Sequence, residues 1–423
     1  MNWRAGLLVS GLFLGATLHP AGAARAELTA DPKFRDAVAK AESRLRGGDA
    51  AGAKAALAAL SPASPLEKYM VSSLALEVAT KNGDMVAQRK AVADVLESGA
   101  APQGQLAYLN HIAGYLSYQT GAIDNAITYL ARARELGRTD PQTSLLLTES
   151  LVRKRRTDEA LKVLGETISA QVQAGKPVPA SWYDRAAALA YARKDWVSLA
   201  SYNAGKLRDP SVGGPDWRSA LATYVEGARP DKEAELDLYR LQAATGGLAS
   251  ERDYQGYAAL AAGQGYAVEA QSVIEGGASA GKLASSDPMA ATLLRTVKPK
   301  AIKTLSAMKA LPGKAGAVAN GARAAQDGDS LLASSQYAAA VPYYRAALDK
   351  GGVDRNRVST RLGIALARSG DFDGAGAALK QVSGAWAPVA TYWAAWVDAR
   401  KLGGAAQAAA DGTGAAKTIA MKQ

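Results

Sequence analysis

Apolar residues recur along most of the chain with the spacing of an α-helix, in runs separated by short polar or glycine-containing breaks. The segment from Tyr108 to Asp140 shows this clearly, because two such runs flank a break between Gln119 and Ala122. An amphipathic helix buries its apolar stripe against a neighbour, and a short break returns the next helix antiparallel to the first. The pattern therefore predicts pairs of helices joined by tight turns.

The predicted helix pairs repeat along the sequence. A step of 34 residues places Ala126 over Ala160 and Leu130 over Leu164. A step of 35 residues relates two C-terminal segments, in which the matched positions are Gly328 and Gly363, Tyr337 and Phe372, Ala340 and Ala375, and Tyr344 and Leu379. A period of this length is that of one helical hairpin. The sequence predicts an array of about nine to eleven such hairpins.

This repeat resembles the tetratricopeptide repeat (TPR) family. The family signature sets Leu-Gly in the first helix, a glycine and an aromatic residue at the turn, and an alanine followed four residues later by a large apolar residue. The C-terminal copy has these features at Leu362, Gly363, Gly370, Phe372, Ala375 and Leu379. The resemblance implies an all-α fold, an α-solenoid wound as a right-handed superhelix of TPR-like helical hairpins. It also implies that the first helix of each hairpin lines a concave, partner-binding surface.

The glycine-rich stretch after Ser369 is interpreted as the turn of a hairpin. Gly370 suits a left-handed helix C-cap, and Asp371 suits the N-cap of the next helix. A calcium loop that starts at Asp371 would need oxygen ligands where Ala375 and Val382 stand. A phosphate loop would need a following Lys-Ser or Lys-Thr pair, which is absent.

Loops rich in proline and glycine, such as Gly175 to Pro179, indicate the boundaries between blocks of repeats. The expected segments are a cleavable signal peptide (1–26), N-terminal TPR-like repeats (27–175), degenerate helical-hairpin repeats (176–320), a C-terminal TPR pair with a capping helix (321–400) and a flexible tail (401–423). Interruptions by glycine, serine and proline leave the pairing of helices within 276–320 open.

The first residues have the features of a secretory signal peptide. A positive charge at Arg4 precedes an apolar stretch from Ala5 to Leu18, and an A-x-A cleavage pattern ends at Ala26. An uncleaved anchor is the alternative. The chain contains no cysteine, so a lipid-modified amino terminus and disulfides are excluded. We expect an exported, periplasmic protein that is not a lipoprotein and has no stable membrane span after signal cleavage.

The chain is basic, with a formal net charge of +11. Removal of the signal takes away Arg4 and Arg25 and no acid, which leaves 11 minus 2, or +9. Scattered lysines and arginines on helices are usually solvated surface residues. Export makes nucleic acid an unexpected partner, whereas acidic polysaccharide, lipid head groups or an acidic protein suit the charge.

The sequence offers few residues for catalysis. Of two histidines, His19 lies in the signal peptide, and His111 lies within a predicted helix, where a packing or pocket role is expected. Without cysteine and with one remaining histidine, we expect no metal site, no cofactor and no nucleophilic triad. A pair of carboxylates remains the alternative, but Asp and Glu are expected mostly at helix caps and exposed faces. The expectation is therefore a protein without enzymatic activity.

The best candidate for partner binding is one face of the first helix in the 108–140 hairpin. Under the TPR resemblance, its inward-facing residues are Tyr108, His111, Tyr115, Tyr118 and Gln119. Tyrosine supplies rigid amphipathic contact area, which suits peptide binding. The alternative is that some of these tyrosines pack against the adjacent hairpin.

A cationic run from Leu151 to Arg156 ends the first helix of the next hairpin. Arg153 and Arg156 are candidates for contact with an acidic ligand, whereas stabilisation of the helix dipole is the alternative interpretation. In the C-terminal pair, Arg357, Arg361 and Arg368 are candidates for the groove, with surface solvation as the default.

These expectations together predict a non-enzymatic periplasmic scaffold or adaptor. It would bind a protein or peptide partner in the cell envelope through its concave surface, in envelope assembly, secretion or polymer export. The alternative is a glycan-directed envelope protein that binds peptidoglycan or acidic polysaccharide, or that acts like a transglycosylase.

Overall fold

A computed structural model describes the backbone of residues 29–284, 286–311 and 313–420, and the side chains of this part as far as Gly404. Every regular element in the described part is a helix, which confirms the predicted all-α fold of TPR-like hairpins. The predicted signal peptide, residues 1–26, lies outside the described residues. The predicted tail, 401–423, begins inside the last helix. Its final three residues, like the signal peptide, lie outside the described part.

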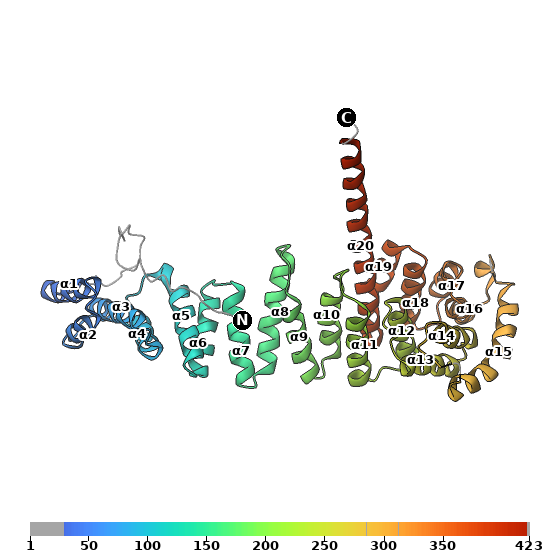
Figure 1. Ribbon diagram of the computed structural model, residues 1–423, viewed down its shortest axis with the longest axis horizontal. Coiled ribbons are helices and arrows are strands. Elements are labelled where there is room, and N and C mark those ends of the chain that lie inside the picture. Colours follow the sequence, from blue (N-terminus) through green and yellow to red (C-terminus); the bar gives the residue numbers. More distant parts are fainter. Residues whose placement is uncertain (1–28, 285, 312, 421–423) are drawn as a thin grey trace. The chain divides into compact units, whose positions relative to one another are not determined.

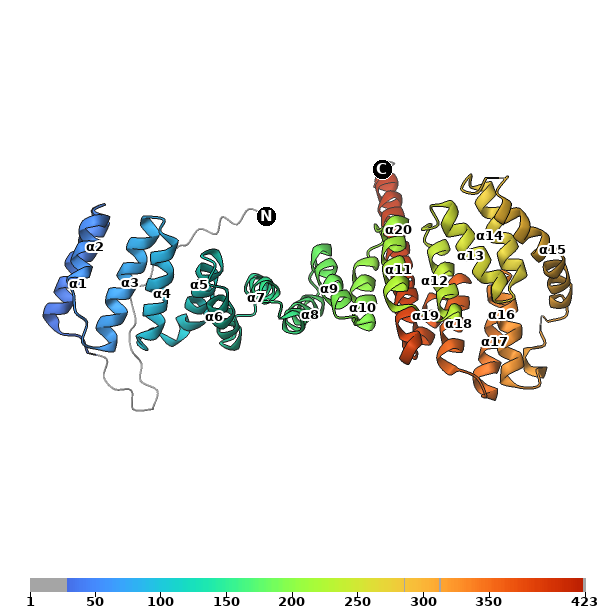
Figure 2. The same ribbon diagram turned by 90° about the horizontal axis from the view of Figure 1, so that it is seen from below.

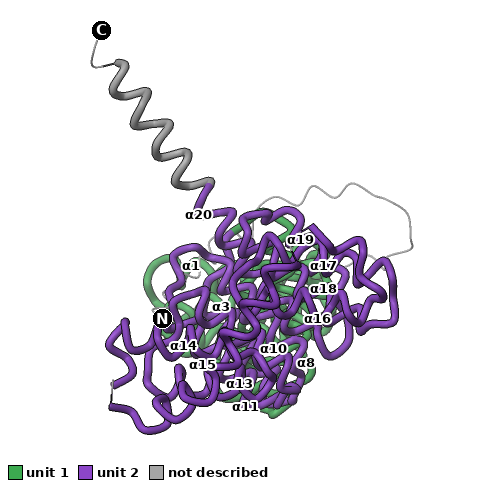
Figure 3. Tube along the Cα trace, turned by 90° about the vertical axis from the view of Figure 1, so that its right-hand side faces the viewer, with its two compact units in different colours: residues 1–176 green, residues 177–423 purple. Residues whose placement is uncertain are grey.

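The chain divides into two compact units, Met1–Lys176 and Pro177–Gln423 (Figure 3). In unit 1, consecutive helices pair as antiparallel hairpins (Figure 1). Its helices are α1 (Pro32–Arg46), α2 (Ala50–Ala58), α3 (Pro65–Lys81), α4 (Met85–Glu97), α5 (Leu106–Gln119), α6 (Ile123–Glu135), α7 (Pro141–Arg153) and α8 (Thr157–Gln173), with a 3-10 turn η1 (Gln103–Gln105) before α5.

Unit 2 continues the same hairpin pattern and adds two longer helices. Its helices are α9 (Ala180–Ala192), α10 (Trp196–Leu207), α11 (Gly214–Ala228), α12 (Lys232–Ala244), α13 (Glu251–Gly263), α14 (Ala267–Ser279), α15 (Pro288–Met308), α16 (Gly321–Ala333), α17 (Tyr337–Lys350), α18 (Arg355–Arg368), α19 (Phe372–Lys380) and α20 (Ala387–Ala420), with 3-10 turns η2 (Ala315–Ala317) and η3 (Gly384–Trp386). The segment whose pairing the sequence left open contains α15, which packs against α14 and α13.

Local sequence signals place the helix ends. Gly370, between α18 and α19, has a φ of +92°, a conformation that glycine adopts without strain. The Asp371 side chain then accepts a hydrogen bond from the Gly374 amide at 2.8 Å and caps α19. Gly121, in the turn between α5 and α6, has a φ of +80°. These turns lie where the polar breaks in the sequence predict them.

One contact recurs within the hairpins and explains the repeated small residues. A glycine in the first helix lies against the large side chain that follows it by sixteen residues in the second helix. A β-carbon built on Gly114 would lie 2.5 Å from Leu130, and one built on Gly363 would lie 2.5 Å from Leu379. Leu130 is fully buried and Leu379 nearly so. The absence of a side chain therefore allows the two helices to approach closely.

Unit 2 folds back on itself, because its last helix packs against an early one. Helix α20 lies against α19 and α18 and also against α10, which is far away in sequence (Figure 2). The Asn203 amide donates to the Tyr392 hydroxyl at 3.0 Å, and the Trp393 indole donates to the Asp237 carbonyl at 3.0 Å. Both Tyr392 and Trp393 are fully buried. The C-terminal helix thus brings the two limbs of unit 2 together.

We predict that Gly363→Ala destabilises the protein, because the added methyl group overlaps Leu379. Overpacking of this kind costs about 1–3 kcal/mol, which exceeds the gain of about 0.5–1 kcal/mol from better helix propensity. Gly376→Ala, in α19 of the same hairpin, is the matched control, since nothing lies within 4 Å of its added carbon. Urea unfolding should show a loss for Gly363→Ala and no loss for Gly376→Ala. Equal effects of the two substitutions would contradict the packing argument.

Candidate functional site

The tyrosine face that the sequence predicts as a binding strip lies on α5, and parts of it contact the next hairpin. Tyr108 is 41% exposed, and the Arg138 guanidinium lies 5.6 Å from the centre of its ring. The His111 Nδ1 atom lies 2.8 Å from the Thr143 hydroxyl of α7. Burial lowers the pKa of His111, and the nearby Arg138 lowers it further. His111 is therefore a neutral residue that joins two hairpins.

The other residues predicted to bind a partner also differ in environment, since some contact other side chains of the fold and others are exposed. The Arg153 guanidinium stacks on the Tyr118 ring at 4.1 Å, so the structure brings these two predicted residues together. Tyr115 is half-buried and packs against a core cluster that includes Leu116. Gln119 is exposed. Arg156 forms a two-point ion pair with Glu159 at 2.6 and 2.7 Å.

A second group of charged residues lies in unit 2, and only its two α18 arginines were predicted as groove candidates. Its members lie on four helices and form what we call the buried ion network: Asp237 and Arg240 of α12, Glu269 of α14, Asp329 of α16, and Arg357 and Arg361 of α18. Arg361 is completely buried, which corrects the expectation that the C-terminal arginines are solvated surface residues. Asp237 is equally buried, an exception to the expectation that acids lie mostly at helix caps and exposed faces.

Arg361 is at the centre of the buried ion network. Its Nε atom lies 3.1 Å from an Asp237 carboxylate oxygen, and its Nη1 atom lies 2.8 Å from Asp329. Asp329 also accepts from Arg357 at 2.9 Å and from the Tyr344 hydroxyl at 2.8 Å. Burial alone would raise the pKa of Asp329, but the two guanidinium groups outweigh it and lower that pKa. Asp329 therefore stays charged inside the fold.

Arg240 and Glu269 extend the network toward an open pocket. The Arg240 Nε and Nη2 atoms donate to the two Glu269 oxygens at 2.8 and 2.6 Å. The Tyr257 hydroxyl donates to the same carboxylate at 2.7 Å. Burial, followed by the nearby Glu269 charge, raises the pKa of Tyr257 well above its usual value, so the phenol stays protonated. Both oxygens of Glu269 are thus occupied.

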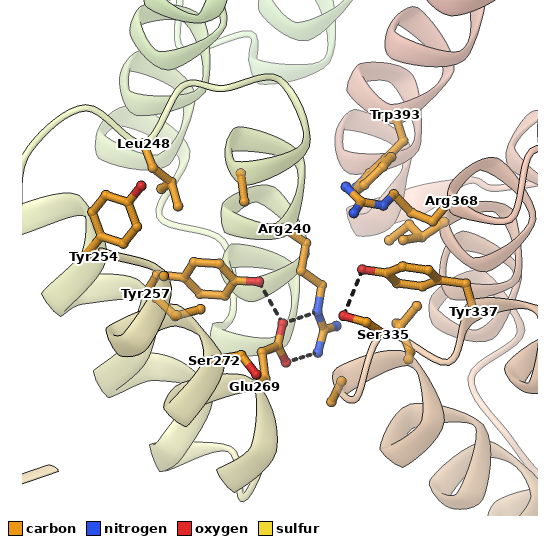
Figure 4. A pocket seen from close by; sticks show the side chains of 16 residues that line it. Arg240, Leu248, Tyr254, Tyr257, Glu269, Ser272, Ser335, Tyr337, Arg368 and Trp393 are labelled. Carbon is orange, nitrogen blue, oxygen red and sulfur yellow. Dashed lines mark hydrogen bonds and ion pairs between the residues drawn. The ribbon is translucent and has the colours of Figure 1, made fainter. Parts of the chain in front are cut away.

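The pocket has a volume of about 310 Å³ and lies between the α12–α14 limb and the limb formed by α16, α18 and α20. Figure 4 shows Leu248 and Tyr254 on one side, Tyr337 and Arg368 on the other, and the Arg240–Glu269 pair between them. Apolar and aromatic side chains therefore line the sides of the pocket, and the Arg240–Glu269 ion pair, whose charges offset each other, lies at its base. Such a lining suits an apolar side chain of a ligand.

Arg368 differs from the other arginines of the pocket region. Its guanidinium lies 4.9 Å from the centre of the Tyr337 ring, and it forms no ion pair with a described residue. The side chain is exposed at the edge of the pocket. Tyr337 is held by a hydrogen bond from its hydroxyl to Ser335 at 3.2 Å. A guanidinium that is held in place without an acidic partner, beside an apolar pocket, can donate hydrogen bonds to a carboxylate of a ligand.

Sequence reasoning named Arg368 as a groove candidate but did not find the residues opposite it. Leu248 and Tyr254 precede Arg368 by more than a hundred residues, so no local spacing relates them. No group of three or more potential metal ligands occurs among the described residues. Within the same part of the chain, no helix has the length and apolar content needed to cross a bilayer.

Comparisons with known proteins concern only the arrangement of helices. No protein-family model matches the chain, and no curated protein matches its sequence. Similar solved structures include Naa15/Naa10 bound to HypK-THB, at 12% identity and a TM-score of 0.31, with 82% of this chain and 57% of that chain covered. The TPR2AB domain of yeast Sti1 in complex with pHSP90 has 14% identity, a TM-score of 0.23, and coverage of 69% and 99%. The APC/C hetero-tetramer Cut9–Hcn1 has 12% identity, a TM-score of 0.25, and coverage of 77% and 68%.

These comparisons assign no partner to the chain. The chain spans 57% of the length of the first of these structures. The described residues themselves define the class: an all-helical repeat protein of TPR-like hairpins, with an aromatic pocket in unit 2.

We predict that Asp329→Asn destabilises the protein at neutral pH and much less under acidic conditions. Loss of one member of a buried ion pair costs about 3–5 kcal/mol, because the arginines keep their charge. The pKa of Asp329 is lowered by folding, so its contribution is present above the unfolded value of about 3.9 and is lost as the pH falls below it. Urea unfolding of both proteins at neutral pH and below that value measures the difference. A difference that does not shrink in acid would contradict this account.

We also predict a direct coupling between Tyr118 and Arg153. A cation–π pair near the surface contributes about 0.5–1 kcal/mol. A double-mutant cycle of Tyr118→Leu and Arg153→Gln should give a coupling free energy of that size in urea unfolding. The control cycle replaces Tyr118→Leu with Tyr115→Leu, and its coupling should be near zero. A coupling free energy of zero between Tyr118 and Arg153 would contradict this prediction. Tyr118 would then be available to bind a partner.

Proposed function

We propose that this protein is a non-enzymatic scaffold that binds an extended peptide segment of a protein partner. The observation that carries the proposal is the pocket of unit 2, in which Arg368 stands without an acidic partner among the described residues. TPR-like hairpins support this role, because a stack of rigid helices presents a preformed surface and little ordering cost is incurred on binding.

The chemistry of the pocket defines the segment that would bind. Leu248, Tyr254 and Tyr337 offer apolar area for one large side chain of the ligand. Arg368 offers two parallel donors for a carboxylate, either an acidic side chain or the end of a chain. The preferred ligand is therefore a segment with an acidic group next to an apolar or aromatic residue.

The contacts of the ionisable residues support a binding role over catalysis. Glu269 is the acid that lines the pocket in the described part, and Arg240 and Tyr257 occupy both its oxygens. His111 is engaged by Thr143 in unit 1. A general acid or base needs access to the atom from which it takes or to which it gives a proton. Glu269 does not offer that access, and the Nδ1 atom of His111 is already engaged.

The cellular setting of the proposal is the bacterial periplasm. The positive charge at Arg4, the apolar stretch after it and the cleavage pattern ending at Ala26 support export by a signal peptide. The absence of cysteine argues against a lipoprotein. The partner would then be another protein of the cell envelope, engaged in assembly, secretion or polymer export.

We expect Arg368→Gln to weaken the binding of selected peptides by roughly tenfold, since a hydrogen bond to a charged group contributes about 1.5–3 kcal/mol. Residues 27–423 would be immobilised and used to select from a displayed library of random peptides, and affinities would be measured by calorimetry. Arg345→Gln is the matched control, because Arg345 is an exposed arginine of α17 that does not line the pocket.

The outcomes distinguish the peptide-binding proposal from the glycan-directed alternative. Enriched peptides with Asp or Glu beside an apolar residue, and a loss confined to Arg368→Gln, support the proposal. Equal losses in both variants would sink it. Retention of polygalacturonate in place of peptides, again dependent on Arg368, would favour the glycan-directed alternative.

A further inference from the structure

Helix α15 has one face buried and one face without a covering element. Its buried residues, Ala290, Val297, Ala301 and Met308, form a stripe along the helix, which packs against α14 and α13. Figures 1 and 2 show α15 at the margin of unit 2, outside α14 and α16. The opposite side of α15 therefore has no neighbour from the described part of this unit.

A regular stripe of exposed cationic and aliphatic residues runs along one flank of α15, about a quarter turn from the buried stripe. At 3.6 residues per turn, steps of three and four residues keep one face of a helix, and this stripe follows them: Arg295, Lys298, Ile302, Leu305 and Lys309. Ile302 is 70% exposed and Leu305 is 42% exposed. Over its length of about 21 Å, an aliphatic centre is thus flanked by cations at both ends.

The charge of this region has one sign over a long stretch of sequence. Residues 288–326 contain no Asp or Glu, and their cations are Arg295, Lys298, Lys300, Lys303, Lys309, Lys314 and Arg323. Within the described part, Lys298 lies 3.7 Å from Glu275 and Arg323 pairs with Asp327. The other lysines form no ion pair there. Apart from Lys298, the cations of this face have no acidic partner in the described part, and they surround two exposed aliphatic side chains.

We propose that this face of α15 docks unit 2 on a membrane surface rich in anionic phospholipids. Lysine and arginine would contact lipid phosphates, and Ile302 and Leu305 would enter the boundary between head groups and acyl chains. Lysines spread along both flanks of a helix suit a fluid anionic surface, because lipids can move to meet each charge. Each cation near such a surface strengthens binding roughly fivefold.

This docking surface is independent of the peptide pocket. Its residues lie on α15 and at Lys309, which follows it, whereas the pocket is lined by residues outside this segment. Docking requires no membrane-crossing helix, since the helix would lie parallel to the surface. A scaffold held in this way could bind its peptide partner beside a membrane.

Sedimentation with lipid vesicles tests the proposal. Residues 27–423 should pellet with vesicles of equal parts phosphatidylglycerol and phosphatidylcholine, should not pellet with phosphatidylcholine alone, and should be released by high salt. The double variant Ile302→Ser, Lys309→Gln should bind at least tenfold more weakly, because one cation and one inserted aliphatic side chain of the stripe are lost. The matched control is Val172→Ser, Lys162→Gln, which makes the same exchanges on exposed positions of α8.

A fluorescence measurement locates the docking face directly. The natural chain has no cysteine, so Ile302→Cys provides a single site for an environment-sensitive dye. Its emission should shift to the blue on anionic vesicles, whereas a dye on Val172→Cys, at a position that is 56% exposed, should not shift. Equal weakening in the two double variants, equal dye shifts, or retention on polyglutamate without any vesicle binding would overturn the proposal.

Discussion

The burial of the Arg361 guanidinium is the constraint on which unit 2 depends. Removing a charge from water costs several kcal/mol, and that cost is offset only when opposite charges are placed around it. Here Asp237 comes from α12, 124 residues away in sequence, and Asp329 comes from α16. Three helices must therefore meet at one point for the fold to be stable. One nitrogen of Arg361, Nη2, makes no hydrogen bond to a described residue, so this arrangement retains an energetic cost.

The packing of these helices around Arg361 also determines the shape of the pocket. Arg240, which forms its floor with Glu269, also pairs with Asp237, so the pocket and the Arg361 site share one carboxylate. On the opposite wall, α20 is held by the Trp393 hydrogen bond to the Asp237 carbonyl. A ligand would therefore enter a site whose walls are already positioned by buried charges. Such preorganisation reduces the ordering cost of binding.

The surfaces of the molecule differ in what they leave unpaired. On α5 and α7, aromatic and cationic side chains satisfy one another, as Tyr118 and Arg153 do. At the pocket, Arg368 keeps its charge available, and on α15 several lysines and two aliphatic side chains face outward together. A repeat fold permits this, because the contacts that build each hairpin involve its inner faces only. The outer faces are free to acquire separate binding chemistries.

The sequence alone determined the hairpins, because their signals are local. Apolar spacing, Gly370 at a left-handed turn, Asp371 at a helix cap and the glycine opposite Leu379 all act within one repeat. Only the tertiary structure decided whether Arg361 and Arg368 are buried or exposed. The two residues lie seven positions apart on the same face of α18. One is completely buried and the other is exposed, because Asp237 returns beside Arg361 from a distant repeat and no acid reaches Arg368 among the described residues. Such partners come from the closure of unit 2 through α20, which no local period encodes.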